Sequence, residues 1–239
     1  MADRFYTPDA LVPGEYVLTG PEAHHLAAVR RFGPGDRVVL FNGDGRDHPA
    51  EVVAADRKRS LLNVFPAVAA DRELPFPLEV AAALPKGDRG DYLVEKLTEL
   101  GVARFTPLVT DRTVVHPKEA RLEKLQHAVI EASKQCGRNV LMRVAPLTSW
   151  AAFRASAELP AVRLLLHTSG ERVSVNAVGP GGVVIAVGPE GGFTNAEVTT
   201  AEGWVRVGLG PRVLRVETAA VVAAGWFALH SASRPPSGG

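Results

Sequence analysis

The stretch Val183-Val-Ile-Ala-Val-Gly-Pro-Glu-Gly-Gly-Phe-Thr-Asn-Ala-Glu197 decides the fold of this chain. Its first five residues are all apolar, which is typical of a strand buried on both faces of a parallel sheet. The run Gly188–Gly192 provides backbone freedom for a tight turn. Thr194 followed by Glu197 matches the capping box that opens a helix. The stretch therefore predicts a strand, a glycine-rich turn and a helix.

Similar strand and helix patterns occur on both sides of this stretch. Their alternation favours an α/β fold with a mainly parallel sheet that helices cover on both faces. Pro107 lacks a backbone donor, so we expect its strand to lie at an edge or to end there. The predicted strands are Leu78–Leu84, Val102–Val109, Ala161–Leu166 and Trp204–Val207, and the predicted helices are Asp91–Leu100, Lys118–Cys136 and Val216–Ala232.

The first 72 residues have a different pattern. Short apolar segments such as Arg37–Phe41 alternate with turn clusters, which predicts a small β-barrel or β-sandwich with one short helix after Gly20. The proline-rich segment Leu74-Pro-Phe-Pro77 suggests a domain boundary. We expect domains at 1–72 and 73–232, followed by a disordered tail at 233–239.

The composition excludes several classes of protein. Of 239 residues, 46% are hydrophobic, and 27 Lys and Arg against 26 Asp and Glu leave a net charge of +1. A nucleic-acid surface would therefore be local and made by a few placed arginines. The single cysteine, Cys136, excludes an internal disulfide and a cysteine-based zinc site. No signal peptide is recognisable and the apolar stretch Ala219–Leu229 is too short to span a bilayer, so we expect a cytoplasmic protein without membrane association.

Unusual residues gather at the carboxyl ends of three predicted strands, where open α/β sheets bind ligands. The segments are Leu166–Gly170, Val187–Phe193 and Val207–Thr218. The glycines of the second do not form a Gly-x-Gly-x-x-Gly fingerprint, and no Gly-Lys-Ser/Thr of a P-loop follows them. A simple strand-to-helix turn remains an alternative for this loop taken alone.

Charged residues near these segments are candidates for catalysis. Arg215 precedes a helix start, where a cation is unfavourable unless it meets an anion, whereas Glu217 could simply compensate the helix dipole. Arg138 shares a polar helix stripe with Glu131 and Gln135, although such stripes are more often solvated faces. His24 and His25 have no partner at metal-ligand spacing, so we expect no metal site.

The order of several motifs resembles the bacterial 16S ribosomal RNA uridine-N3 methyltransferases of the SPOUT class. The likeness covers nearly the whole chain, and the last two motifs are the most specific. The motifs are His24-His-Leu26 with Gly35-Asp36, Leu84-Pro-Lys-Gly87, Glu95-Lys96 with Glu99-Leu-Gly-Val102, Glu131-Ala-x-x-Gln135-x-x-Arg138, Gly188-Pro-Glu-Gly-Gly-Phe193 and Leu214-Arg-x-Glu-Thr218.

The resemblance implies an N-terminal PUA-like β-barrel, a C-terminal SPOUT domain with a trefoil knot, a homodimer, and S-adenosylmethionine held by the knot loops. It implies methylation of N3 of a uridine in 16S ribosomal RNA of the small subunit. The candidate catalytic residues are Arg215, Glu217 and Arg138. The candidate RNA-binding residues are Arg4, Arg30, Arg31, Arg57 and Arg59. The candidate cofactor-binding residues are Leu166, His167, Gly188, Pro189, Glu190, Gly191, Gly192, Val207, Leu209, Gly210, Leu214 and Thr218.

Two other functions stay open at this point. One is a SPOUT enzyme that acts on another RNA, such as transfer RNA. The other is a non-catalytic RNA-binding protein that has kept the fold. Binding of S-adenosylmethionine would separate the second from the enzymes.

Overall fold

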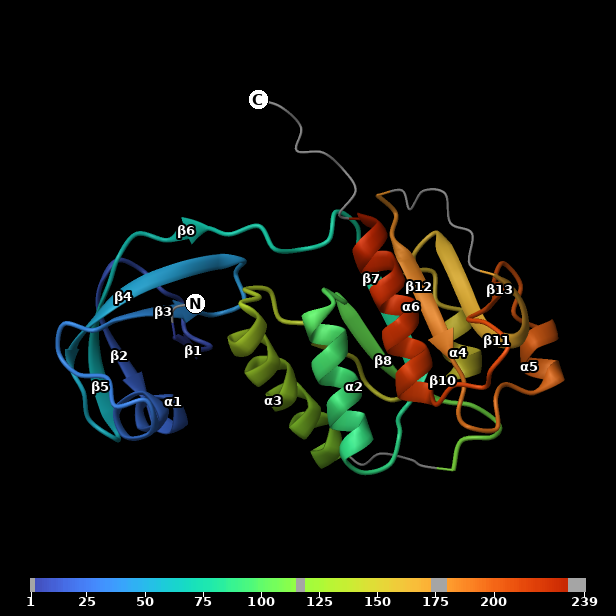
Figure 1. Cartoon of the computed structure of the whole chain (residues 1–239), viewed down its shortest axis with the longest axis horizontal. Helices are drawn as coiled ribbons and strands as arrows, with labels where there is room; N and C mark the ends of the chain where they lie inside the picture. Colours follow the sequence, from blue (N-terminus) through green and yellow to red (C-terminus); the bar gives the residue numbers. More distant parts are fainter. Residues whose placement is uncertain (1–2, 115–118, 173–179, 232–239) are drawn as a thin grey trace. The chain divides into compact units, whose positions relative to one another are not determined.

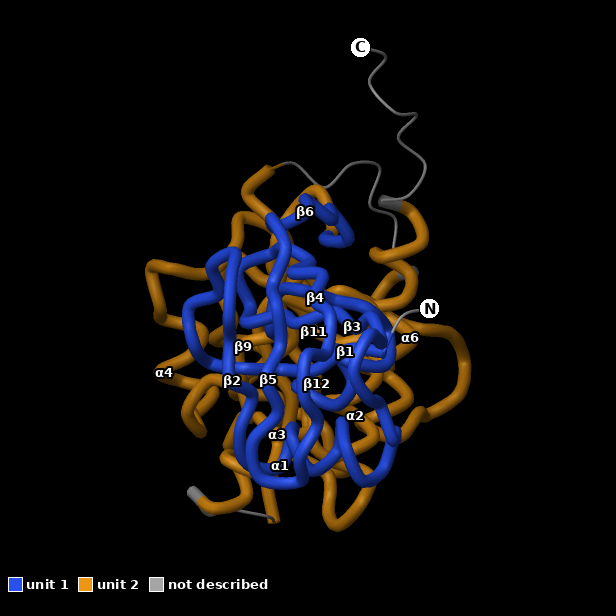
Figure 2. The backbone as a smooth tube through the Cα atoms, turned by 90° about the vertical axis from the view of Figure 1, so that its left-hand side faces the viewer, with its two compact units in different colours: residues 1–73, 130–141 blue, residues 74–129, 142–239 orange. Residues whose placement is uncertain are grey.

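A computed structural model describes residues 3–114, 119–172 and 180–231 of the chain. The chain forms two compact units, which Figure 2 shows in different colours. Unit 1 comprises Met1–Glu73 and Ile130–Leu141, and unit 2 comprises Leu74–Val129 and Met142–Gly239. The tail expected at 233–239 lies outside the described residues. None of the described helices is both long and apolar enough to cross a membrane.

Unit 1 is built around a mainly antiparallel sheet whose apolar side chains enclose one core. The strand order is β1-β3-β4-β5-β2, with β6 paired to β4. Phe5, Leu40 and Leu62 come from three of these strands and are buried together with Leu26 from the helical segment. The elements are β1 (Arg4–Tyr6), β2 (Gly14–Thr19), α1 (Gly20–His24), the π-helix η1 (His25–Val29), β3 (Arg37–Phe41), β4 (Arg46–Ala54), β5 (Arg59–Val64) and β6 (Val68–Ala69).

Unit 2 contains a second sheet in the order β10-β8-β7-β12-β11-β13, with β9 paired to β8. All strand pairs described in this sheet are parallel, as the alternating pattern predicts. The strands are β7 (Leu78–Ala83), β8 (Arg104–Val109), β9 (Arg143–Val144), β10 (Thr148–Ser149), β11 (Val162–Arg172), β12 (Val183–Val187) and β13 (Val205–Gly208). The helices are α2 (Asp88–Glu99), α4 (Trp150–Arg154), α5 (Asn195–Thr199), α6 (Val216–Ser231) and, up to Val129, α3 (Glu119–Cys136), whose remainder belongs to unit 1.

The central strands of unit 2 are covered on both faces. Every residue of β12 is buried. On one face, Ala81 and Val184 belong to a core with Trp150 of α4 and Trp204, which follows α5. On the other face, α6 packs on β7 and β12 and α2 packs beside α6 (Figure 1). This two-sided burial confirms the prediction made from the apolar run.

Pro107 lies inside the sheet, beside a gap in its pairing. On one side, Pro107 is opposite Ala82 of β7. On the other side, β9 pairs with β8 at Arg104 and Phe105, and β10 pairs at Leu108 and Val109. The two short strands thus flank the proline without requiring its missing N–H. This break lets a proline-containing strand occupy a position next to the edge.

The crossing of β11 and β13 is the tightest backbone contact of unit 2. Leu166 and Glu171 both pair with Val207, so the four residues between them bulge out of β11. A Cβ on Gly170 would lie 2.4 Å from the carbonyl carbon of Val207, and one on Gly208 would lie 2.6 Å from the carbonyl oxygen of Gly170. Only glycines allow these two backbones to approach so closely. The strand predicted to end at Leu166 therefore continues beyond the bulge.

We expect Gly170→Ala to destabilise the protein by about 1–3 kcal/mol, because the added methyl group would collide with backbone that cannot move aside. Urea unfolding measures the change. Gly33→Ala is the control, since nothing lies within 4 Å of its added Cβ, and it should change stability by less than about 0.5 kcal/mol. Equal stabilities of the two variants would contradict the tight crossing.

Candidate functional site

A cavity of about 370 Å³ lies in unit 2, at the carboxyl ends of β11, β12 and β13. Its volume falls in the range of about 300–1,000 Å³ that is usual for small-ligand pockets. All of the predicted cofactor-contacting residues except Thr218 line it. They are Leu166, His167, Gly188, Pro189, Glu190, Gly191, Gly192, Val207, Leu209, Gly210 and Leu214. The structure therefore brings the three predicted segments together at one place.

The glycine-rich loop Gly188–Gly192 forms part of the cavity wall. A Cβ on Gly188 would lie 3.0 Å from the Phe193 ring and its backbone nitrogen. Gly192 has a φ of +67°, which a residue with a side chain rarely adopts, and its N–H donates to the Pro189 carbonyl at 2.7 Å. The capping box predicted at Thr194 and Glu197 is confirmed and begins α5 directly after this loop.

His167 belongs to the bulge in β11. Its Nδ1 lies 2.8 Å from the Ser169 hydroxyl and accepts the Ser169 N–H at 3.2 Å. His167 is thus held by its own loop where it lines the cavity.

Several lining residues were missed by the sequence interpretation. Most are direct neighbours of predicted ones, but Arg112 comes from the loop after β8. That loop follows a parallel strand and lies at the same edge of the sheet as the other three segments. Its position after a strand is the sequence signal that could have identified Arg112. The missed residues are Arg112, Thr168, Val187, Phe193, Asn195, Arg212, Val213, Val216 and Ala219.

Arg215 and Glu217 flank the start of α6 but do not line the cavity. Arg215 is exposed, whereas Glu217 is only 6% exposed. Glu217 Oε1 lies 3.6 Å from Nη1 of Arg89, and the same nitrogen is 3.7 Å from Oε1 of Glu190. Oε2 of Glu217 is buried without a hydrogen-bond partner in the described structure. The cation that faces both carboxylates is therefore Arg89 of α2, which the sequence interpretation did not select.

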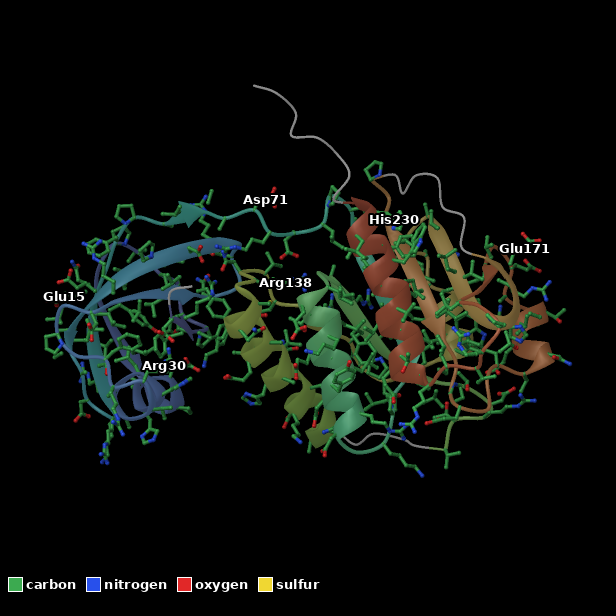
Figure 3. All side chains as sticks on the ribbon, viewed as in Figure 1. Glu15, Arg30, Asp71, Arg138, Glu171 and His230 are labelled. Carbon is green, nitrogen blue, oxygen red and sulfur yellow. The ribbon has the colours of Figure 1, made fainter. Side chains whose placement is uncertain are left out.

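Arg138 is held by an ion pair within unit 1, and its support of the reaction stays a prediction. It belongs to unit 1, is only 4% exposed, and donates from Nε and Nη2 to the Glu73 carboxylate at 2.8 and 2.6 Å. Charge-assisted hydrogen bonds to one carboxylate hold this guanidinium in a fixed orientation. Figure 3 labels Arg138 at the end of α3.

Arg4 is also buried, at 7% exposure, and its contact with RNA stays a prediction. Its Nη1 donates to Asp47 at 2.6 Å, its Nη2 donates to Asn139, and its guanidinium lies 5.0 Å above the Phe41 ring centre. Burial acts to raise the pKa of Asp47, but hydrogen bonds from Arg72 and Arg4 hold that pKa below its usual value. Arg4 thus neutralises an internal carboxylate of unit 1.

The other predicted RNA-binding arginines of unit 1 are exposed. Arg30, labelled in Figure 3, forms an ion pair with Asp3. Arg31 has a φ of 58°, the one described residue other than glycine in the left-handed region. Arg57 and Arg59 flank Lys58 in a turn whose N–H groups are partly held by Asp56. These arginines can reach a polyanion from the surface of unit 1.

Among the described residues, no group of three or more His, Cys, Asp and Glu side chains is placed to hold a metal ion.

Comparison with known proteins points to one family. Residues 72–228 match the model of an RNA methyltransferase domain, and residues 18–65 match the model of an RNA methyltransferase PUA domain. The chain is similar to ribosomal RNA small subunit methyltransferase E of Synechocystis, at 33% identity over 90% of this chain and 73% of that protein. It is also similar to the Bacillus subtilis protein of that name, at 32% identity over 87% of each.

Two solved structures resemble the chain over nearly its full length. One is ribosomal RNA small subunit methyltransferase E of Neisseria gonorrhoeae bound to S-adenosylmethionine, with a TM-score of 0.88 and 30% identity. The other is a Legionella pneumophila protein in complex with the bound cofactor SAM, with a TM-score of 0.88 and 29% identity. Each alignment covers 96% of this chain and 98% of the other.

We expect Arg89→Met to destabilise the protein by about 1 kcal/mol, because Glu217 would lose the cation that faces it. Glu217→Gln removes that buried charge, so the loss caused by Arg89→Met should shrink in the double variant. Urea unfolding of the four proteins measures this coupling. Strictly additive losses would show that the two side chains do not interact.

Proposed function

The chain belongs to the RNA methyltransferase family with an N-terminal PUA domain, and from this premise we propose that it methylates N3 of a uridine in 16S ribosomal RNA. Its fold is an α/β SPOUT domain with a trefoil knot, preceded by a PUA-like β-barrel. The observation that carries the proposal is the cavity at the strand ends of unit 2, whose lining includes the whole Gly188–Gly192 loop. A ribosomal RNA substrate would place the reaction in the cytoplasm.

The residues of the cavity fit S-adenosylmethionine as cofactor. Bound there, it would supply an electrophilic methyl group. The Gly188–Gly192 backbone and the segment Leu209–Leu214 offer N–H and C=O groups to an adenosyl unit, and Leu166 and Val187 supply apolar wall. The exposed carboxylate of Glu190 is the acidic group of the lining. The chemistry of these groups suits a cationic, polar ligand with a flat aromatic base.

The uracil must lose the N3 proton before this nitrogen can act as a nucleophile. We assign proton acceptance to Glu190, since it lines the cavity and Glu217 is buried beside Arg89. The N3–H bond then breaks, and the electron pair stays on the ring and spreads to O2 and O4. Arg215, exposed between the lining residues Leu214 and Val216, is the cation that would stabilise this charge.

Unit 1 would bind the ribosomal RNA through its phosphates. Arg30, Arg31, Arg57 and Arg59 are exposed there, and phosphate contacts of this kind set register without reading base sequence. The target uridine would have to leave its stack to enter the cavity. Unit 1 would thus bind the RNA backbone, and unit 2 would bind the base that reacts.

We also propose that the protein acts as a homodimer. Val222 and Leu229 of α6 are 47% and 73% exposed, which is unusual for large apolar residues on a helix that otherwise packs into the core. Sedimentation velocity should therefore give twice the 25.4 kDa mass of one chain. Leu229→Glu should shift the protein toward monomer, and a wild-type monomer at micromolar concentration would contradict this proposal.

The central experiment uses purified protein, S-adenosylmethionine and small ribosomal subunits from cells that lack the gene. Nucleoside mass spectrometry should detect 3-methyluridine in the 16S ribosomal RNA only after wild-type protein is added. Arg215→Ala should lower kcat by about 10²-fold, since one charge-stabilising donor is lost. Its affinity for S-adenosylmethionine by calorimetry should stay unchanged.

Arg143→Ala is the matched control, because Arg143 is exposed on β9 and neither it nor its chain neighbours line the cavity. It should methylate at the wild-type rate. Persistence of 3-methyluridine at every site in the RNA of the deletion strain would reject the named substrate. A normal rate for Arg215→Ala would remove that residue from the reaction.

A further inference from the structure

Arg112 presents an exposed cation to the cavity from a part of the chain that lies outside the predicted segments. It follows β8 in the loop at residues 110–114, at the same edge of the sheet as the cavity, and it lines that cavity. We propose that Arg112 binds a phosphate of the RNA substrate next to the nucleotide that enters the cavity. The inference rests on the proposed function and adds a positioning residue to it.

The loop around Arg112 is held on both sides. The Thr110 N–H donates to the Thr113 hydroxyl at 2.8 Å, and the Thr113 N–H donates to the Thr110 carbonyl at 3.0 Å. The Asp111 N–H donates to Oε1 of Glu197 at 3.0 Å, and the same carboxylate accepts the Thr194 N–H at 2.7 Å. The backbone that carries Arg112 is therefore tied to the first turn of α5, just beyond the glycine-rich loop.

The side chain of Arg112 lies across Gly191. Its Nη1 donates to the Gly191 carbonyl at 2.6 Å, and a Cβ on Gly191 would come within 3.3 Å of Arg112 Cδ. The absence of a side chain at Gly191 is thus what lets the arginine reach over the loop. This single hydrogen bond fixes the guanidinium and uses one of its five N–H donors.

Among the described residues, the positive charge of Arg112 has no acidic side chain beside it to balance it. Within the part of the chain that the structure describes, no carboxylate is recorded within 4 Å of Arg112, and the residue is exposed. Arg89, by contrast, faces two carboxylates in the same unit. A fixed guanidinium without an acidic partner at the rim of a cavity suits an external anion.

A phosphate of RNA is the anion that the position favours. A nucleotide whose base enters the cavity carries its two flanking phosphates to the rim, where the exposed guanidinium lies. The planar fork of an arginine matches two phosphate oxygens. The carboxylate of the cofactor's methionine part is the other anion available, and the experiment separates the two.

The test compares Arg112→Gln with Arg154→Gln. Arg154 also donates from Nη1 to a backbone carbonyl, that of Thr200, at 2.6 Å, but it does not line the cavity. Binding to 16S ribosomal RNA transcribed in vitro is measured by fluorescence anisotropy at several salt concentrations. Loss of one phosphate contact should reduce the slope of log K against log salt by about 0.7–0.9. We expect this reduction for Arg112→Gln only.

Steady-state kinetics supply a second readout. Arg112→Gln should raise KM for small ribosomal subunits about tenfold, while the Kd for S-adenosylmethionine from calorimetry stays within about twofold of wild type. Arg112→Lys keeps the charge and should keep the salt slope. Thermal unfolding of each variant shows that it is folded, and if the glutamine variant is not, Arg112→Ala provides the same comparison.

Three results would overturn the inference: an unchanged salt slope in Arg112→Gln, an equal change in Arg154→Gln, or a loss of cofactor affinity in place of RNA affinity. The last result would assign Arg112 to the cofactor's carboxylate. Failure of the proposed function looks different, because wild-type protein itself would then form no methyluridine in 16S ribosomal RNA.

Discussion

The arrangement of unit 2 depends on one steric constraint, the close approach of two backbones at Gly170 and Gly208. The bulge in β11 and the end of β13 touch without any side chain between them. This contact brings the segments Leu166–Gly170 and Val207–Leu214 to the edge where the Gly188–Gly192 loop also lies. A larger residue at the crossing would separate the walls of the cavity. The packing of unit 2 and the shape of the proposed ligand site therefore both depend on these two glycines.

The charges around the cavity divide into two groups. Arg89 is balanced by Glu190 and Glu217, one exposed and one buried, and so stabilises the folded protein at the start of α6. Arg112 donates to the Gly191 carbonyl and faces no carboxylate among the residues that the structure describes. A buried or balanced cation contributes to architecture, whereas an unbalanced one at a rim attracts a ligand. The same distinction separates Arg4 and Arg138, which face carboxylates inside unit 1, from its exposed arginines.

Local patterns were sufficient to predict much of this architecture. The apolar run Val183–Val187 and the capping box at Thr194 and Glu197 depend on neighbouring residues only, and both are confirmed. The pairing of Arg138 with Glu73 joins residues 65 positions apart, and that of Arg89 with Glu217 joins residues still farther apart. No periodicity encodes such contacts, so the sequence alone did not show that Arg138 and Arg4 are buried and paired, and it overlooked Arg89 and Arg112.

Helix α3 has a consequence for dissecting the protein. Its residues up to Val129 belong to unit 2, and the rest belongs to unit 1 with the segment that follows, to Leu141. The polypeptide therefore passes between the units three times. A fragment that ends at residue 73 would lack Asn139, which accepts a hydrogen bond from Arg4, and Arg138, which pairs with Glu73. An expressed fragment of the first 73 residues would leave Glu73 without its arginine, and a complete unit 1 requires residues 130–141 to be grafted back.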